Sequence, residues 1–174
     1  MTTPQDALDR ILDQWRRERP DLDTSPMGVV GRISRLARLV ETAQRRTFAE
    51  HGLDPASFDV LATLRRSGPP YRLTPGELTR SAMVTSGAIT QRLHGLEARG
   101  LVRRTPSTED GRSRVVELTP GGRAAVDAVL PHHLATERQL LAGLAGDDLR
   151  ALATLLGRLL EELEGPAAPG QGSR

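Results

Sequence analysis

Apolar residues recur along this chain at the three- and four-residue spacing of amphipathic helices. The first such stretch runs from about Pro4 to Arg17, a long one from about Met27 to Glu50, and a third from about Pro55 to Ser67. Two further helical patterns span about Pro120 to Leu144 and Asp147 to Leu163. With two short helices in the central region, the chain is predicted to form seven helices and one β-hairpin.

Helix starts are marked by a capping side chain that is followed by proline at the first helical position. At Thr74 a capping box is completed by Glu77, while Gly52, Gly68 and Gly100 stand where helices should stop. The five marked starts are Thr3-Pro4, Ser25-Pro26, Asp54-Pro55, Thr74-Pro75 and Thr119-Pro120.

The first and last helices each carry an apolar stripe that must be buried against something. Within the helical pattern that begins at Pro120, Pro131 lacks an N–H and should kink or split the helix. Such terminal helices, flanking a compact centre, most simply pack against the same helices of a second copy. The stripes are Leu8, Ile11, Leu12 and Trp15 at the start, and Leu149, Leu152, Leu156, Leu159 and Leu163, widened by Leu155 and Leu160, at the end.

The central region combines a helix that opens at Thr74, a second helix over about Ser86 to Arg99, and a hairpin. The hairpin pairs Leu101 to Arg104 with Arg114 to Leu118 around an arginine-containing turn. This order is that of a winged helix-turn-helix, which places one helix and one basic hairpin on the same side of a small domain. The arrangement suits the wide groove of duplex DNA and the adjacent narrow groove.

The predicted fold class is therefore mainly α with a small β-hairpin. A winged helix-turn-helix domain is joined to N- and C-terminal dimerisation helices. The expected parts are an added helix and linker (1–24), a dimerisation helix (25–53), the DNA-binding region (54–119), C-terminal dimerisation helices (120–164) and a disordered tail (165–174).

One face of the second central helix is predicted to read DNA. At about 100° per residue, Ile89, Leu93 and Leu96 form the buried stripe. The opposite face consists of small or polar side chains, and the helix N-terminus suits a phosphate. The alternative is a polar, solvated face without a partner. The predicted DNA contacts here are Thr85, Ser86, Gly87, Thr90, Gln91, which can pair with adenine, and His94.

The hairpin turn supplies the remaining predicted DNA contacts. A narrow minor groove favours an inserted guanidinium, which makes Arg112 the candidate for that contact. Asp110 would hold the turn and Arg114 would lie near the DNA backbone, and Arg103 is a further predicted DNA contact. The alternative is a set of exposed ion pairs, each worth about 0 to 1 kcal/mol.

The distribution of charge supports a polyanionic partner. The chain has 24 cationic side chains, all arginine, and a net charge of only +2. Residues 60–123 hold 11 arginines against 5 acidic residues, a local charge of +6, so the remainder must carry about −4. The positive charge therefore gathers on the region that is expected to bind DNA.

Several classes of function lack the residues that they need. The chain has no cysteine, which excludes disulfides, thiolate metal sites and thiol-based redox sensing. Adjacent His132 and His133 point in different directions on a helix and are expected to be solvated or to lie in an interface. We expect no catalytic site, no metal, no cofactor and no membrane partner, and the protein should be cytoplasmic.

In its central region the chain resembles the multiple-antibiotic-resistance regulator (MarR) family of winged-helix transcriptional regulators. The matching residues are Gly100-Leu101-Val102-Arg103-Arg104, Glu109-Asp110-Gly111-Arg112-Ser113 and Val116-Glu117-Leu118-Thr119-Pro120-Gly121-Gly122-Arg123, in order and spacing. The resemblance covers roughly Met27 to Leu163. It implies a homodimer that binds a pseudo-palindromic DNA operator, usually as a repressor, and is released by a small ligand.

The added first helix is similar to that of the urate-responsive branch of this family. The resemblance implies an effector site of Trp15, Asp59, Arg92 and Arg104. By its helical position Arg92 is aimed at its own subunit rather than at DNA bases, and Asp59 is costly to bury unless an arginine pairs with it. An anionic, planar ligand would stack near Trp15 and compete with Asp59 for an arginine. The alternative is a structural Asp59–arginine ion pair with Trp15 merely packing.

Two other functions stay open at this point. One is a winged helix that binds DNA without a ligand, and the other is a protein-interaction module. DNA binding predicts an affinity that falls steeply with salt, which an interaction module has no reason to show.

Overall fold

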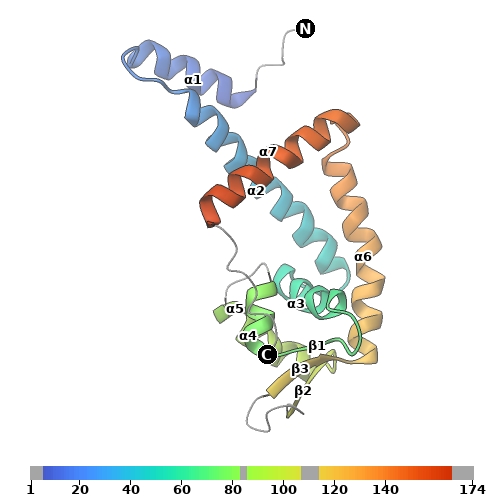
Figure 1. The fold of residues 1–174 in the computed structure, drawn as a ribbon. Helices are drawn as coiled ribbons and strands as arrows, with labels where there is room; N and C mark the ends of the chain where they lie inside the picture. The colour runs from blue at the N-terminus through green and yellow to red at the C-terminus, as the bar shows by residue number, and fades with distance from the viewer. Residues whose placement is uncertain (1–5, 83–85, 107–113, 166–174) are drawn as a thin grey trace. The chain divides into compact units, whose positions relative to one another are not determined.

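The computed structural model describes residues 6–82, 86–106 and 114–165, which form seven helices and a three-stranded sheet (Figure 1). The chain divides into two compact units, Met1–Thr136 and Glu137–Arg174. The predicted seven helices and the hairpin are confirmed, and the sheet has one short strand more than the sequence indicated.

The first helix, α1 (Ala7–Glu18), begins at a capping box that the sequence analysis did not identify. The Asp6 carboxylate accepts hydrogen bonds from the backbone N–H groups of Leu8 (2.7 Å) and Asp9 (3.1 Å), and the Asp9 carboxylate accepts one from Asp6 N (2.9 Å). The predicted start at Pro4 was therefore wrong, because Asp6 and Asp9 satisfy the first free N–H groups. The Thr3-Pro4 pair itself lies outside the described residues.

Helix α1 packs on the first turns of α2 (Ser25–Glu50) where two glycines allow a close approach. A Cβ atom at Gly31 would lie 2.7 Å from Leu8 Cδ1, and one at Gly28 would lie 3.0 Å from Leu12 Cδ1. Leu12 is buried in this contact. The pairing of Leu12 with Gly28 and of Leu8 with Gly31 makes the two helices antiparallel.

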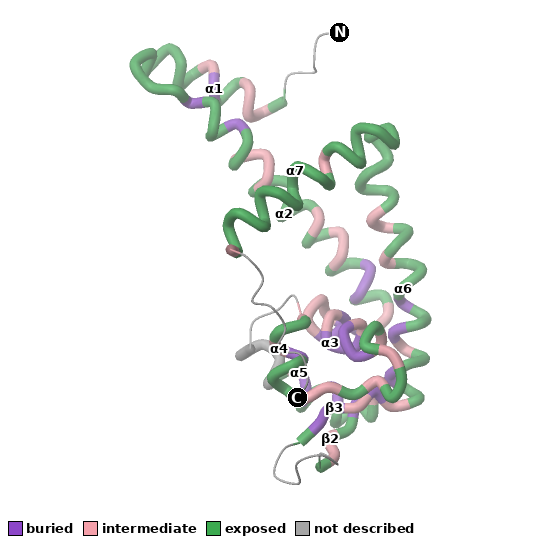
Figure 2. Tube along the Cα trace, viewed as in Figure 1, coloured by how far each residue is buried: buried purple, intermediate pink, exposed green. Residues whose placement is uncertain are grey.

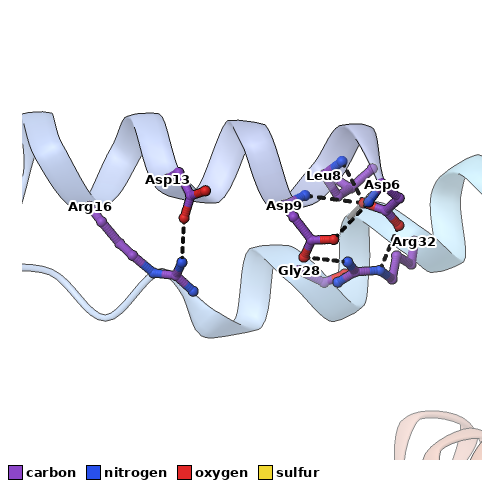
Figure 3. Close-up of polar contacts among 7 residues, drawn as sticks. All are labelled: Asp6, Leu8, Asp9, Asp13, Arg16, Gly28 and Arg32. Carbon is purple, nitrogen blue, oxygen red and sulfur yellow. Dashed lines mark hydrogen bonds and ion pairs between the residues drawn. The ribbon is translucent and has the colours of Figure 1, made fainter. Parts of the chain in front are cut away.

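An arginine of α2 fastens the N-terminal end of α1 (Figure 3). Arg32 donates from Nη2 to Asp9 Oδ1 (2.7 Å) and from Nε to Asp6 Oδ2 (2.9 Å), and its Nη1 donates to the carbonyl of Gly28 (3.3 Å). The hydrogen bond from Arg32 lowers the pKa of Asp9 below its ordinary value of 3.8. Docking of α1 is therefore coupled to ionisation of this carboxylate.

Acid is expected to loosen α1 in a way that depends on Arg32. Because the pKa of Asp9 is lowered in the folded chain, its contribution to docking is complete above pH 4 or so and is lost as the pH falls through the lowered pKa. Emission of the single tryptophan, Trp15, reports α1 and should shift as the pH falls below 3.8 and through the lowered pKa of Asp9. Arg32→Met should show the loosened emission already at neutral pH; identical profiles for the two proteins would contradict this coupling.

The second helix then leads into the winged helix-turn-helix. Its three helices are α3 (Pro55–Arg66), α4 (Pro75–Ser81) and α5 (Ser86–Ala98). The sheet has the antiparallel order β1-β3-β2, with β1 (Arg72–Leu73), β2 (Val102–Pro106) and β3 (Arg114–Leu118). In its register Val102 faces Leu118 and Pro106 faces Arg114.

Three of the five predicted helix caps are confirmed, at Asp54, Thr74 and Thr119. Asp54 accepts from Ser57 N (3.1 Å) at the start of α3, Thr74 and Glu77 form the predicted capping box at α4, and Thr119 Oγ1 accepts from Gly122 N (2.9 Å) at α6. At α2 the capping position is Thr24, which makes no side-chain capping bond.

The core of the first unit surrounds α3 (Figure 2). Phe58 stacks on Phe48 from the end of α2, with ring centroids 4.4 Å apart. The buried apolar residues that pack with them come from α3, α4, α5, the sheet and α6: Val60, Leu61, Leu64, Leu78, Leu93, Leu96, Val102, Val116, Leu118, Val126 and Val129. Helix α5 and the sheet are thus held on one shared core.

Helix α6 (Pro120–Leu140) continues through Pro131 as a single helix, so the predicted split was wrong. Because Pro131 has no N–H, the backbone carbonyl of Asp127, four residues earlier, loses its helical hydrogen bond. Both residues are exposed, so water can bond that carbonyl instead. The N-terminal end of α6 lies against the backbone of Leu101. A Cβ atom at Gly122 would lie 1.9 Å from the carbonyl oxygen of Leu101.

In the second unit, α7 (Gly146–Glu164) has no buried residue. Six leucines of its predicted stripe are exposed: Leu149, Leu155, Leu156, Leu159, Leu160 and Leu163. The predicted tail beyond Gly165 lies outside the described residues, and the predicted domain boundaries stay predictions.

Candidate nucleic-acid interface and effector site

The reading helix α5 presents the two faces that its sequence predicts. Leu93 and Leu96 are buried in the core, while Gln91 and His94 are exposed on the opposite side. Thr85 and the side chains of residues 86–90, which include the other predicted contacts of this helix, lie outside what the structure describes. Gln91 and His94 therefore lie on the side of α5 that the core leaves exposed, and their contact with DNA stays a prediction.

The sheet separates two neighbouring arginines onto its two faces. Arg104 reaches Glu97 of α5, with Nε 3.4 Å from Oε2, so its side chain lies on the face that α5 covers. Arg103, the preceding residue, points to the other face and forms a bidentate pair with Glu117 at 3.1 and 2.6 Å. Arg103 is thus already neutralised on the side of the sheet away from the reading helix.

The rest of the wing is described only at its base. Arg114 is exposed at the start of β3, where the strand leads from the turn. Arg112 and Asp110 lie in the turn, outside the described residues. Their assignment to the minor groove stays a prediction.

Arg92 is aimed at its own subunit, as its position on α5 predicts. Its Nε lies 3.3 Å from Asp54 Oδ1, at the cap of α3. Partial desolvation raises the pKa of Asp54, but hydrogen bonds from Ser57 and the charge of Arg92 outweigh this and hold the pKa below its ordinary value. Asp54 therefore stays ionised as both a helix cap and the partner of Arg92.

Three guanidinium N–H groups of the predicted effector site lack a hydrogen bond. Arg92 Nε, Arg104 Nε and Arg104 Nη2 are buried and find no acceptor with suitable geometry among the described residues. A buried donor of this kind costs about 1 to 3 kcal/mol, more when it is charged. Two of them, Arg92 Nε and Arg104 Nε, lie 3.3 and 3.4 Å from the carboxylates of Asp54 and Glu97 without hydrogen-bond geometry. A well-placed carboxylate or enolate oxygen would satisfy such groups.

The other two predicted effector residues, Asp59 and Trp15, lie on α3 and α1. Asp59 is nearly buried on α3, with one carboxylate oxygen 4.0 Å from Arg66 Nη1. Trp15 lies on α1 and is 42% exposed. The structure thus places Asp59, Arg92 and Arg104 on the packed elements α3, α5 and β2, whereas Trp15 lies on a helix that packs on the start of α2 (Figure 1).

Sequence analysis missed Asp54 and Glu97 as partners of the two arginines. Asp54 was identified only as a helix cap, and nothing in the spacing of Glu97 indicates that it would face Arg104 across the turn into β2.

The two adjacent histidines point in different directions, as predicted, but the expectation that both would be solvated or in an interface was wrong for His133. His133 packs against Phe48 and Phe58, with ring centroids 5.2 and 5.0 Å apart, and His132 lies beside His51 at 4.7 Å. Within the described part of the chain no group of three or more metal-binding side chains forms. No described helix has the length and apolar character that crossing a bilayer requires.

Comparison with known proteins agrees with this geometry. The sequence model of the MarR family matches residues 51–113. The HTH-type transcriptional regulator PecS of Dickeya dadantii is 39% identical over 153 residues, which cover 88% of this chain and 92% of PecS. The crystal structure of AbsC, a MarR family regulator from Streptomyces coelicolor, has a TM-score of 0.75 at 24% identity and covers 83% of this chain and 97% of AbsC.

A second solved structure shows a relative bound to nucleic acid. A cysteine-to-serine mutant of Escherichia coli MarR in complex with operator DNA has a TM-score of 0.69 at 25% identity, covering 90% of this chain and 99% of that one. The fold and the reading helix define a winged-helix DNA-binding protein. The chain belongs to the MarR family of transcriptional regulators, and its relatives are regulators rather than enzymes.

Proposed function

We propose that this regulator is a homodimeric repressor that binds a pseudo-palindromic operator in the cytoplasm and is released by a small anionic ligand. The observation that carries the ligand-responsive part is the set of buried, unsatisfied N–H groups on Arg92 and Arg104. One of these arginines is on the reading helix and the other is at the base of the wing. An anion that binds them therefore acts directly on both DNA-contacting elements.

Exposed apolar surface supports the homodimer. The leucines of α7 offer a continuous stripe, and the first half of α2 exposes Val29, Val30, Leu36 and Leu39. Such surface on a regulator that reads two half-sites is most simply covered by the same helices of a second copy. The two reading helices would then be about one DNA turn apart, near 10 base pairs.

On DNA, the exposed side of α5 would enter the major groove and the wing the minor groove. Arg112 is the proposed minor-groove contact, with Arg114 on the backbone. Arg112→Ala is expected to weaken binding and to lower the slope of log affinity against log salt by about 1 per contact that is lost. Fluorescence anisotropy at several salt concentrations measures this slope, with Arg158→Ala on α7 as a control that should change neither value.

The ligand would release DNA by competing for the arginines of α5 and β2. At present Asp54 and Glu97 hold them by ion pairs that leave buried N–H groups unsatisfied. A planar anion such as urate or a related purine would satisfy these groups and move the reading helix against α3. A small rotation of each helix changes the spacing of the two half-sites, which weakens operator binding.

Titrating urate and related purines into the protein–DNA complex tests this proposal. Release at saturating ligand is expected for the unaltered protein, and Arg92→Met should require at least about tenfold more ligand, since it loses charged hydrogen bonds worth about 1.5 to 3 kcal/mol. Arg99→Met, in the turn that directly follows α5, serves as the control. If none of these compounds releases the DNA, the purine proposal is wrong.

A second candidate function is DNA binding without an effector. The ion pairs of Arg92 with Asp54 and of Arg104 with Glu97 favour it, because they give both arginines a structural role. In that case Arg92→Met should lower the stability of the fold and leave operator binding insensitive to every anion. Thermal unfolding and the titration above separate the two functions.

A further inference from the structure

The face of the sheet opposite α5 carries a cavity at the base of the wing. Its volume is about 560 Å³, which is within the range of small-molecule sites. It is formed by the turn before β1, by β2 and β3, and by the first turns of α6. Its aromatic and charged lining consists of Tyr71, Arg103, Glu117, Arg123 and Asp127.

Tyr71 is held firmly in this cavity. Its φ of 59° lies in the left-handed region, which is unfavourable for a residue with a bulky side chain. Hydrogen bonds from its N–H to the carbonyl of Gly68 (2.7 Å) and from Leu118 N to its own carbonyl (3.0 Å) maintain this conformation. The guanidinium carbons of Arg65 and Arg123 each lie 5.2 Å from the centre of its ring. Backbone strain of this kind is found most often at ligand-binding and catalytic sites.

The arginines of the cavity differ in how well they are paired. Arg103 forms its bidentate pair with Glu117, and Arg65, behind the Tyr71 ring, donates from Nε to Asp127 Oδ1 at 2.8 Å. Arg123 Nε is 3.6 Å from Asp127 Oδ2, and the Arg123 guanidinium forms no hydrogen bond with any described residue. Arg123 is therefore positioned in the cavity with its N–H groups available.

Arg72 supplies a second uncompensated charge on the same face of the sheet. It is paired in register with Glu117, which is itself paired with Arg103, so the three side chains form one row across the strands. Arg72 is exposed and forms no ion pair with another residue in the described ranges. Four arginines against two carboxylates leave a net charge of +2, and the positive end of α6 adds to it at Thr119 and Pro120.

We propose that this cavity binds a nucleoside monophosphate. A phosphate monoester carries a charge of about −1.5 to −2 at pH 7, which balances the two uncompensated arginines, whereas a carboxylate would balance only one of them. The phosphate would accept bidentate hydrogen bonds from Arg123. A sugar hydroxyl would donate to Asp127 Oδ2, and the flat base would lie against apolar walls that include Pro70, Pro120 and Ala124.

This site is separate from the proposed effector site. Arg104 lies on the face of the sheet that α5 covers, and Arg92 is on α5 itself, whereas the cavity opens on the other face. The proposal therefore does not rest on the effector proposal. Arg92→Met should bind a nucleotide here as the unaltered protein does.

Isothermal titration calorimetry of the full-length protein with AMP tests the proposal. Adenosine, which lacks the phosphate, should bind at least about tenfold more weakly than AMP. Arg123→Met should lower the affinity for AMP by at least about tenfold for the same reason. Arg138→Met, farther along the same helix, is the matched control and should bind AMP normally.

A second substitution blocks the cavity without removing any of its contacts. Ala124 is exposed on α6, so Ala124→Glu places a carboxylate at the cavity wall and should also weaken AMP binding by at least about tenfold. Ala135→Glu adds the same charge about three turns away and should have no effect.

Three results would each overturn the proposal. The first is no binding of AMP by the unaltered protein at up to about 1 mM. The second is an unchanged affinity for AMP in Ala124→Glu. The third is displacement of AMP by a DNA duplex of unrelated sequence, which would assign the cavity to the phosphates of DNA.

Discussion

Gly122→Ala is expected to prevent stable folding of the winged-helix unit. The new Cβ atom would lie 1.9 Å from the carbonyl oxygen of Leu101, 2.8 Å from its carbonyl carbon and 2.9 Å from Leu118 Cδ1. The first two contacts are with backbone, which cannot rotate away as a side-chain end can. Relief requires α6 to separate from the turn between α5 and β2, which breaks the core around Val126. We expect a loss of at least about 3 kcal/mol in the free energy of unfolding.

Urea unfolding followed by circular dichroism measures this loss. Gly121→Ala provides the matched control, because its Cβ atom would meet only Thr119 Oγ1 at 3.7 Å and the carbonyl of Gly100 at 3.8 Å, both ordinary contacts. The control should change the stability by less than about 1 kcal/mol. Equal stabilities for the two variants would contradict the packing that we describe for α6.

Placing charge on the leucine stripe of α7 is expected to abolish operator binding by separating the dimer. Leu156 and Leu163 are 40% and 74% exposed and lie two turns apart on the same side of the helix. Leu156→Glu together with Leu163→Glu would place two carboxylates in an apolar interface, where neither has a partner. A single subunit reads one half-site, so the affinity for the operator should fall about 10²- to 10⁴-fold.

Sedimentation velocity and anisotropy with operator DNA measure both effects. Thr154→Glu adds the same charge on the opposite side of α7 and should leave a dimer that binds DNA normally. Retention of a dimer by the double variant would contradict the role of this stripe, since the substitution does not touch the winged helix.

Local chemistry explains why much of the fold was predictable. Asp54, Thr74 and Thr119 each precede proline, and each caps the helix that follows, because a short polar side chain and a preset backbone angle act within a few residues. The rule did not mark the start of α1, which begins at Ala7 after a complete capping box of Asp6 and Asp9. The reciprocal hydrogen bonds between Asp6 and Asp9 thus set where α1 begins.

Features that depend on distant contacts were not predictable. Strand β1 has only two residues, and it forms because Arg72 and Leu73 meet β3 across the sheet. Helix α6 tolerates Pro131 because the affected carbonyl is exposed, which no helical pattern reveals.

For the candidate site, the sequence indicated the correct direction for Arg92 but not its partner. Helical periodicity fixes the face on which a side chain lies. Whether that side chain meets Asp54 or Asp59 depends on how α3 and α5 cross. The position of Trp15 likewise follows from the two glycines that set where α1 packs on α2.

The most direct test of the account measures how the protein binds the DNA upstream of its own gene as salt is varied. The account predicts two chains per duplex and an affinity that falls by about 10³-fold or more between 50 and 200 mM salt, as expected for six or more phosphate contacts. Binding by a single chain, or an affinity that does not change over this range, would contradict the claim that paired winged helices hold the operator.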